Sequence, residues 1–388
     1  MKDDIVFVGA KRTPFGKFGG ALKDLTATEL GVIATQAALT QGNVPANAVG
    51  HVIFGNVIQS SPDAAYLARH IALKAGCEIA TPALTLNRLC GSGFEAVIQG
   101  AHLLQRGDTK VVVAGGSESM SQAPYVLRNA RFGYRMDNGE LEDSLMAGLT
   151  DAYAGIPMAI TAENLAKEYS ISRQRCDEFA VQSQTRASEA LADIDRELCP
   201  VQVGEGKRQI SLSKDEHVRP GTDLESLAKL RPVFQKDGVV TAGNASGMVD
   251  GACALVMTTK AYAEKNGWAI LGTYVDSFVV GCDPKIMGIG PVPAVKGLLT
   301  KTGMEKNQIH HWEVNEAFAA QALSVCQGLD LNPDQINRQG GAIAIGHPLA
   351  ATGARILAHL LYQSGVGENS IGSACIGGGQ GIAVLIRK

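Results

Sequence analysis

The chain has 388 residues, enough for two or three domains, and 45% of them are hydrophobic while 5% are aromatic, which is typical of an α/β protein. Its formal net charge is −3, which gives no electrostatic basis for a nucleic-acid partner. No apolar run approaches the roughly 18 residues that a membrane span needs, so we expect no membrane-spanning segment.

The first third of the chain alternates between strand-like and helix-like segments. Residues 5–8 and 50–55 are short apolar runs of the kind found in buried strands, and residues 28–40 and 64–75 have apolar side chains at helical spacing. A further apolar run at 110–114 ends in two glycines. This alternation predicts a mostly parallel sheet with helices on both faces.

The pattern changes near residue 120. Residues 120–240 contain little strand signal and hold polar loops, two helical segments and a charged stretch at 207–231. We expect an insertion outside the sheet, with helices and loops that cover a site. Buried strands and helices resume at residues 251–257 and continue through a C-terminal third that repeats the alternation of the first.

Cys90 lies between an apolar run and a Gly-Ser-Gly turn, and residues 94–104 have helical spacing. If this helix forms, the thiol lies at its N-terminus, where free N–H groups and the helix dipole favour an anion. A thiol held there loses its proton more easily and becomes a nucleophile. The alternative is that Cys90 is a buried small hydrophobic side chain.

A short repeat links this cysteine to a histidine. The sequence Ala-His-Leu-Leu at residue 101 recurs at residue 358, and the same offset of 257 (358 − 101 and 347 − 90) relates Cys90 to His347. The offset predicts two similar halves with Cys90 and His347 at equivalent helix starts that face each other. A neutral His347 imidazole there would take the proton of Cys90, although a structural histidine in the core is the alternative.

Two further segments carry polar residues at the ends of apolar runs. Cys375 ends a predicted strand and precedes three glycines, an arrangement that lacks the Lys-Ser/Thr of a phosphate loop. Asn315 and Glu316 interrupt an apolar run, where the Asn either caps a helix or holds a water or a carbonyl oxygen. Together these residues indicate one thiolate that attacks an acyl group and a second thiol that shuttles a proton.

The eight cysteines include no Cys-x-x-Cys pair, which argues against a zinc site and a disulfide framework. We therefore expect reduced thiols and a cytoplasmic protein. The N-terminus is acidic and enters a strand directly, unlike a secretory signal or a transit peptide.

Four ordered segments resemble the signature blocks of the thiolases: Cys-Gly-Ser-Gly from residue 90, Asn-Glu-Ala-Phe from 315, Gly-His-Pro from 346 and Cys-Ile-Gly from 375. Segments such as Gly-Gly-Ser-Glu-Ser-Met-Ser, which begins at residue 115, extend the resemblance over the whole chain. Within the family, the chain is most similar to 3-ketoacyl-CoA thiolases of the mitochondrial type.

The resemblance implies a duplicated α/β fold of five layers, αβαβα. It implies an N-terminal half made of residues 1–119 and 244–269, a loop domain at 120–243 that covers the CoA site, and a C-terminal half at 270–388. It further implies acyl-CoA and CoA as substrates, no metal or prosthetic group, and a homotetramer or homodimer.

The family motifs also imply residue roles. Cys90 would hold the acyl group in reversible ping-pong transfer, His347 would activate it, and Cys375 would be the acid and base for the α-carbon of acetyl-CoA. Asn315 would hold a water that forms one oxyanion hole with His347, and the backbone N–H groups of Cys90 and Gly377 would form the other.

By the same resemblance, the CoA contacts would come from seven residues, with Arg219 on the adenine and Ser246 on the pantetheine. They are Met158, Arg219, Ser226, Phe234, Ala242, Ser246 and Phe318.

The chain departs from the family at two places. Pro157-Met158 stands where biosynthetic members have His-Met, and Ala350 stands where a glycine is commoner, so it adds a methyl group near a helix start. A decarboxylating ketoacyl-synthase-type enzyme and a non-catalytic acyl-CoA-binding protein are the alternatives.

Overall fold

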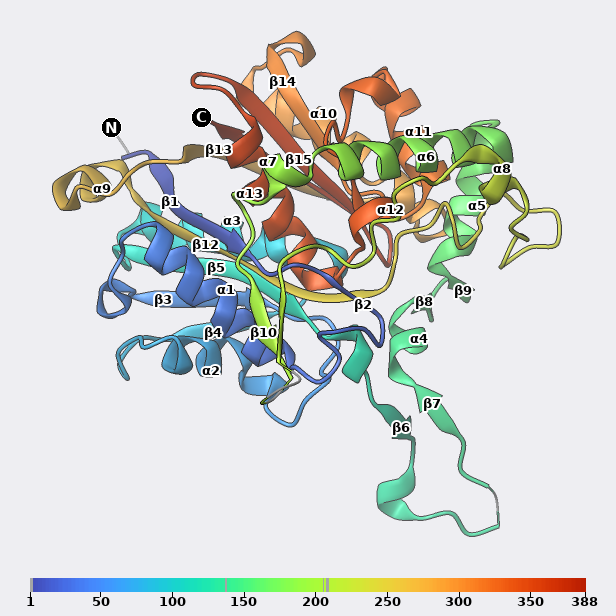
Figure 1. Cartoon of the computed structure of the whole chain (residues 1–388), viewed down its shortest axis with the longest axis horizontal. Coiled ribbons are helices and arrows are strands. Elements are labelled where there is room, and N and C mark those ends of the chain that lie inside the picture. The colour runs from blue at the N-terminus through green and yellow to red at the C-terminus, as the bar shows by residue number, and fades with distance from the viewer. Residues whose placement is uncertain (1–2, 137, 205, 207–208) are drawn as a thin grey trace.

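The computed structural model describes residues 3–136, 138–204, 206 and 209–388, so the first two residues of the charged stretch expected at 207–231 lie outside the described residues. Among these residues, ten strands form one sheet in the order β14-β15-β16-β13-β1-β12-β5-β3-β4, with the short β2 paired to β12 (Figure 1). The strands are β1 (Ile5–Arg12), β2 (Gly16–Lys17), β3 (His51–Gly55), β4 (Ala83–Leu86), β5 (Val111–Glu118), β12 (Val249–Thr259), β13 (Gly272–Gly281), β14 (Ile309–Val314), β15 (Asn369–Ile376) and β16 (Gln380–Arg387).

The prediction of a mostly parallel sheet is wrong. Only β3–β4, β3–β5 and β14–β15 pair in parallel, whereas β12 runs antiparallel to both of its long neighbours, β1 and β5. The strands β15 and β16 form an antiparallel hairpin, and β1 joins the two halves by pairing antiparallel to β13. The apolar pattern of a strand reports its burial and not its direction, so the sequence could not distinguish these arrangements.

Helices lie on both faces of each half of the sheet and produce five layers. In β5, Val112 and Ala114 face a central core with α3 (Ser92–Arg106), while Val111 and Val113 face α1 (Ala27–Gln41) and α2 (Leu67–Lys74). The helix α13 (Thr352–Gln363) packs beside α3 in the central layer. On the far face of the C-terminal half lie α10 (Pro291–Thr302) and α11 (Ala319–Leu329). The predicted five-layered α/β fold is therefore confirmed.

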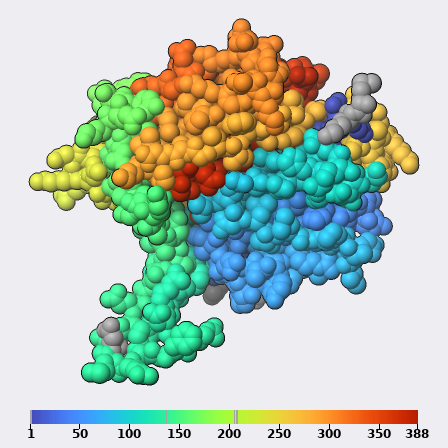
Figure 2. Space-filling model, turned by 180° about the vertical axis from the view of Figure 1, so that it is seen from behind, coloured from blue at the N-terminus to red at the C-terminus, as the bar shows by residue number. Residues whose placement is uncertain are grey.

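The segment between β5 and β12 lies outside the sheet, as expected, but it is not free of strands. Its described residues form three two-stranded ribbons, of which β6 (Tyr125–Leu127) and β7 (Leu141–Asp143) form an arm that projects from the body of the molecule (Figures 1 and 2). The other ribbons and helices of the segment are β8 (Thr150–Asp151), β9 (Ile156–Pro157), β10 (Val201–Val203), β11 (Ile210–Leu212), α4 (Ser144–Gly148), α5 (Met158–Glu168), α6 (Arg173–Glu189), α7 (Leu191–Ile194) and α8 (Leu224–Ala228). Two short helices lie elsewhere, α9 (Lys260–Asn266) and α12 (Ala342–Ile345).

A buried ionic network ties this segment to both halves of the sheet. Arg12, at the end of β1, donates to Glu197 at 2.8 Å and to Asp215 at 2.7 Å. The other oxygen of Glu197 lies 3.0 Å from Nδ1 of His359 on α13. Because these side chains are almost completely removed from solvent, loss of one partner would leave a buried charge uncompensated. No helix among the described residues is long and apolar enough to cross a bilayer.

Candidate active site

Cys90 lies in a tight 3-10 turn, Leu89–Gly91, that connects β4 to α3. The turn is held by Asn87 Oδ1, which accepts from the Leu89 N–H at 2.8 Å, and by Ser92 Oγ, which accepts from the Arg88 N–H at 2.8 Å. Leu89 adopts a φ of 45°, in the left-handed region that non-glycine residues rarely occupy. Such a strained residue beside a cysteine is typical of a functional turn.

The prediction that the helix start makes Cys90 acidic is wrong for the free protein. Burial among protein atoms raises the pKa of Cys90 to about 11, despite hydrogen bonds from the backbone N–H groups of Gly377 and Cys90 itself that act to lower it. The negative charge of Glu118 raises the Cys90 pKa further. Cys90 is therefore a protonated thiol until a substrate or a base acts on it.

His347 follows Gly346, which ends α12 with a φ of 94°. A side chain at Gly346 would place its Cβ 2.3 Å from a methyl group of Val249, so both the conformation and the space require glycine. The His347 N–H donates to the Gly247 carbonyl at 2.9 Å, and Nδ1 lies 2.5 Å from Thr352 Oγ1. Burial, helped by the charge of Arg355, lowers the pKa of His347 to about 3, so the imidazole is neutral.

Cys90 and His347 do not occupy equivalent positions in the two halves. The helices α3 and α13 begin at Ser92 and Thr352, which gives an offset of 260 (352 − 92) and not 257. Each helix is preceded by a 3-10 turn, and Cys90 corresponds to Ala350 within that turn. The two helix starts do face each other, since a Cβ at Gly93 would lie 2.5 Å from the Ala354 nitrogen. His347 therefore reaches the site from three residues upstream of the position that matches Cys90.

Cys375 lies near the end of β15, fully buried, and close enough to Cys90 that the charge of one thiolate would raise the pKa of the other. Burial is the first cause that raises the pKa of Cys375 well above its ordinary value. The glycines after it form the β15–β16 turn, and the N–H of Gly377 is directed at the Cys90 sulfur. Two protonated thiols and a backbone donor thus meet at one point.

Asn315, the residue after β14, is placed beside β15 because its N–H donates to the Ser373 carbonyl at 2.9 Å. Its side-chain Nδ2 lies 3.4 Å from Nε2 of His347. Asn315 Oδ1 is buried and has no hydrogen-bond partner among the described residues. A buried polar atom without a partner, next to a neutral imidazole, marks a place where a polar ligand atom or a water would bind.

An apolar cavity of about 240 Å³ reaches His347. Four residues that the sequence assigned to ligand contacts line it, namely Met158, Phe234, Ser246 and Phe318. The Ser246 N–H donates to the Ala317 carbonyl at 3.0 Å, which holds the segment after residue 241 against the Asn315 block. Sequence reasoning missed several large apolar side chains of the wall, because no local motif indicates them: Met120, Met146, Leu149, Met248 and Leu349.

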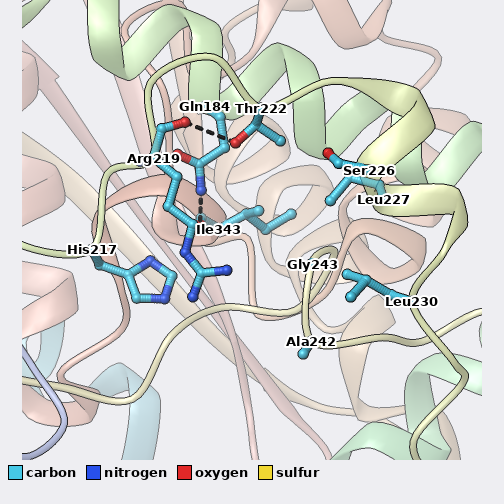
Figure 3. Close-up of a pocket in the computed structure, with 10 residues that line it drawn as sticks. All are labelled: Gln184, His217, Arg219, Thr222, Ser226, Leu227, Leu230, Ala242, Gly243 and Ile343. Carbon is cyan, nitrogen blue, oxygen red and sulfur yellow. Dashed lines mark hydrogen bonds between the residues drawn. The ribbon is translucent and has the colours of Figure 1, made fainter.

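A second cavity, of about 190 Å³, lies between α6, α8 and the segment before β12 (Figure 3). It is lined by the remaining predicted contacts, Arg219, Ser226 and Ala242, together with Gln184 and His217, which the sequence did not indicate. The loop that contains Ala242 continues directly into the wall of the first cavity at residues 245–248. A long ligand could therefore run from the surface near Arg219 along this loop to His347.

The neutral His347 lines the apolar cavity, and both thiols pack against side chains of its wall, an arrangement suited to cysteine-dependent acyl transfer. The described residues contain no cluster of three or more side chains suited to a metal. Family models described as "Thiolase, N-terminal domain" and "Thiolase, C-terminal domain" match residues 5–261 and 268–388. The chain belongs to the thiolase family, and it is an acyltransferase that cleaves or forms 3-ketoacyl-CoA. The ketoacyl-synthase and non-catalytic alternatives find no support.

Relatives of known identity extend over the whole chain. The mitochondrial 3-ketoacyl-CoA thiolase of mouse (Mus musculus) is 51% identical over 99% of this chain and 98% of its own length. Beta-ketothiolase BktB of Cupriavidus necator is 45% identical over 100% of both. The crystal structure of human mitochondrial 3-ketoacyl-CoA thiolase in complex with CoA is 50% identical, with a TM-score of 0.96 over 100% of this chain and 98% of that one.

The expectation of a cytoplasmic protein is contradicted by these relatives. The 51% identical enzymes of mouse, cattle, rat and human are all named as mitochondrial. The reasoning failed because reduced cysteines exclude only oxidising compartments and do not separate the cytoplasm from other reducing ones.

Proposed function

We propose that this thiolase acts by ping-pong transfer through an acyl group on Cys90, with His347 and Cys375 moving the protons. The observation that supports the proposal most directly is the meeting of the Cys90 thiol, the buried Cys375 thiol and the Gly377 N–H. Both thiols pack against side chains of the cavity that the neutral His347 also lines. A neutral imidazole can accept a proton, and an imidazolium cannot.

In the first half of thiolysis, the Cys90 sulfur attacks the 3-keto carbon as its proton passes to His347. The bond between the α-carbon and the keto carbon then breaks, and the acetyl-CoA carbanion takes the proton of Cys375. A thiol with a raised pKa is a stronger base once deprotonated, which suits it to a weakly acidic carbon. An acylated Cys90 carries no charge, so it does not oppose a Cys375 thiolate as a Cys90 thiolate would.

In the second half, the thiol of free CoA gives its proton to the Cys375 thiolate and attacks the acyl group on Cys90. The Cys90 thiolate leaves and recovers its proton from His347, so the protons balance over the cycle. We propose that Asn315, with a bound water, and His347 stabilise one oxyanion. The N–H groups of Cys90 and Gly377 would stabilise the other, since donors fixed before reaction stabilise a developing charge most effectively.

We propose that CoA occupies both cavities, with its adenine on Arg219 and its pantetheine along Ala242 and Ser246 toward His347. The human relative in complex with CoA supports CoA binding, and the loop that connects the two cavities supports the placement along them. Residues 120–243 would then be the loop domain that covers CoA. The apolar wall fits the acyl chain of a fatty-acid β-oxidation substrate, which is the physiological role we propose.

We further propose a homodimer or homotetramer, because two surfaces of the described residues carry exposed apolar side chains. On the projecting arm and its base, Phe132 is 88% exposed and Tyr153 is 91% exposed. On the other surface, β4 is the edge strand of the sheet, with Leu84 at 46% and the nearby Ile79 at 83%. An unpaired edge and an apolar arm are surfaces that subunit contacts cover.

A Cys375→Ser variant tests the division of labour between the two thiols. It should still transfer acetyl from acetyl-CoA to Cys90, but it should fail to exchange the α-hydrogens of acetyl-CoA with heavy water and fail to condense. Cys282→Ser is the matched control, since Cys282 lies near Cys375 but has no proposed role. Normal turnover in Cys375→Ser, or an equal loss in Cys282→Ser, would show that the role of Cys375 is wrong.

A further inference from the structure

Glu118, at the end of β5, is a fully buried carboxylate that the proposed reaction does not use. Each of its oxygens accepts two hydrogen bonds. Oε1 accepts from the Ile58 N–H at 3.0 Å and from Asn56 Nδ2 at 3.1 Å. Oε2 accepts from the N–H groups of Val57 and Ala350, both at 3.1 Å. All four partners are donors, so the carboxylate form is required to satisfy them together.

The partners of Glu118 lie on the segment that follows β3, which is hydrogen-bonded to the Cys90 turn, and on the turn that follows His347. On one side, the Val57 carbonyl accepts from Asn87 Nδ2 at 3.2 Å, and Asn87 in turn holds the strained Leu89 that precedes Cys90. Val57 and Cys90 also pack in the same apolar cluster. Glu118 is thus connected to the Cys90 turn by three successive hydrogen bonds.

On the other side, Ala350 lies in the 3-10 turn that follows His347. The Leu349 N–H donates to the His347 carbonyl at 2.9 Å, so this turn continues directly from the histidine. Its position against β5 leaves no free space, since a Cβ at Gly116 would lie 1.9 Å from the Ala350 oxygen. The Ala350 N–H bond to Glu118 therefore fixes the C-terminal turn against the N-terminal half.

We propose that Glu118 is a positioning residue that holds the Cys90 turn and the His347 turn, which belong to different halves of the fold, at the separation that proton transfer requires. The inference rests on the roles proposed for Cys90 and His347. Glu118 is not proposed to touch the substrate, and it acts through the backbone N–H groups of Val57, Ile58 and Ala350 and the side chain of Asn56. A small displacement of a reacting group can cost about 100-fold in rate.

The set of four hydrogen bonds that Glu118 accepts is sensitive to pH near neutrality. Burial raises the pKa of Glu118 to about 7, against the three backbone N–H bonds that lower it, and the charge of Asp250 raises it further. A protonated carboxyl would direct an O–H at a donor, so it cannot keep all four bonds. The titratable groups coupled to Glu118 are Asp250, whose own pKa is raised by burial, and Cys90, whose pKa of about 11 lies far above neutrality.

Glu118→Gln, made in the full-length enzyme, tests the proposal. We expect kcat to fall roughly 10- to 100-fold with the KM for CoA unchanged, and we expect the decline of kcat/KM below about pH 7 to disappear. Glu163→Gln is the matched control for stability, because Glu163 is a buried carboxylate that accepts the N–H groups of Val239 and Val240 away from Cys90. The Glu163→Gln enzyme should have a lower Tm and should retain the decline of kcat/KM below about pH 7.

Asp250→Asn is a second control, because Asp250 is a buried carboxylate whose charge raises the pKa of Glu118. This variant should retain the decline of kcat/KM at low pH, and the decline should move to lower pH. A Glu118→Gln enzyme with the wild-type kcat and pH profile would overturn the proposal. Losses of kcat that simply follow the Tm in both glutamine variants would overturn it as well.

A measurement on the wild-type enzyme covers the case in which Glu118→Gln does not fold. Hydrogen exchange, corrected for its intrinsic pH dependence, should show that residues 57–58 and 350 lose protection together as the pH falls below about 7. Protection that stays constant at both segments would overturn the proposal. This readout does not depend on catalysis, so its failure is distinguishable from a failure of the roles given to Cys90 and His347.

Discussion

Gly346 is the residue on which the presentation of His347 depends, and its replacement by alanine gives a prediction that can be worked from the structure. Its φ of 94° lies in a region that L side chains avoid, which costs alanine about 1–3 kcal/mol. The new Cβ would also lie 2.3 Å from Val249, and overpacking of this kind costs about 1–3 kcal/mol more. Because Val249 is a fully buried residue of β12, we expect the turn to move instead and to carry His347 with it.

The Gly346→Ala enzyme should therefore lose stability and, on the order of 100-fold, kcat. The control is Gly107→Ala, which has a φ of 79° but no atom within 4 Å of the new Cβ. It should lower the Tm slightly, from backbone strain alone, and keep kcat. Thermal denaturation and steady-state thiolysis of a 3-ketoacyl-CoA measure both effects. Full turnover in Gly346→Ala, with a Tm equal to that of Gly107→Ala, would refute the reasoning.

Three other predictions concern the thiol, the CoA cavity and the buried ionic network. Alkylation of Cys90 by iodoacetamide should accelerate up to about pH 11 in the free enzyme, and a plateau near pH 7 would contradict the burial argument. Arg219→Ala should raise the KM for CoA roughly 2- to 30-fold and leave the α-hydrogen exchange of saturating acetyl-CoA unchanged. Although burial lowers the pKa of His359, Glu197 raises it to above its ordinary value. The His359–Glu197 pair therefore contributes its full stability below about pH 6.5, and this stability is lost as the pH rises through the folded-state pKa of His359. The Tm of the wild-type enzyme should fall between pH 6 and 9, and it should fall less in the His359→Gln variant.

Much of the fold follows from local sequence patterns. The helical spacing of residues 94–104 predicted the core of α3, and the apolar run at 251–257 predicted most of β12. The helix α10 was missed, since it begins with Pro-Val-Pro, which is typical of a loop. The strand β16 was also missed, because it directly follows three glycines and forms its hairpin only by pairing with β15.

The residues of the site were easier to predict than their environment. Gly-rich turns at element ends indicated Cys90, His347 and Cys375, and the interruption of an apolar run indicated Asn315. The structure places Cys90 near Cys375, and Asn315 beside His347. The acidity of Cys90 was predicted wrongly, because the pKa depends on how closely segments such as Val57 and Leu349 surround the thiol, and a local motif does not contain that information. The four-residue repeat also predicted the wrong equivalence: it matched Cys90 with His347, whereas the structure matches Cys90 with Ala350.

The role of Glu118 could not be predicted from the sequence either. In the sequence it is one residue of a Gly-Ser-Glu-Ser segment, and nothing local indicates that its partners lie 60 and 232 residues away. Only the packing of β5 against the turn after His347 makes this carboxylate a link between the two halves.

The central claim is that Cys90, and neither of the other thiols near it, carries the acyl group. The most direct test is brief incubation of the enzyme with acetyl-CoA, acid quenching, and mass spectrometry of the proteolytic peptides. We predict one acetyl group, on the peptide that contains Cys90, and its loss when CoA is added before quenching. An acetyl group on Cys375 or Cys282 instead, or no adduct under conditions in which the enzyme turns over, would contradict the account.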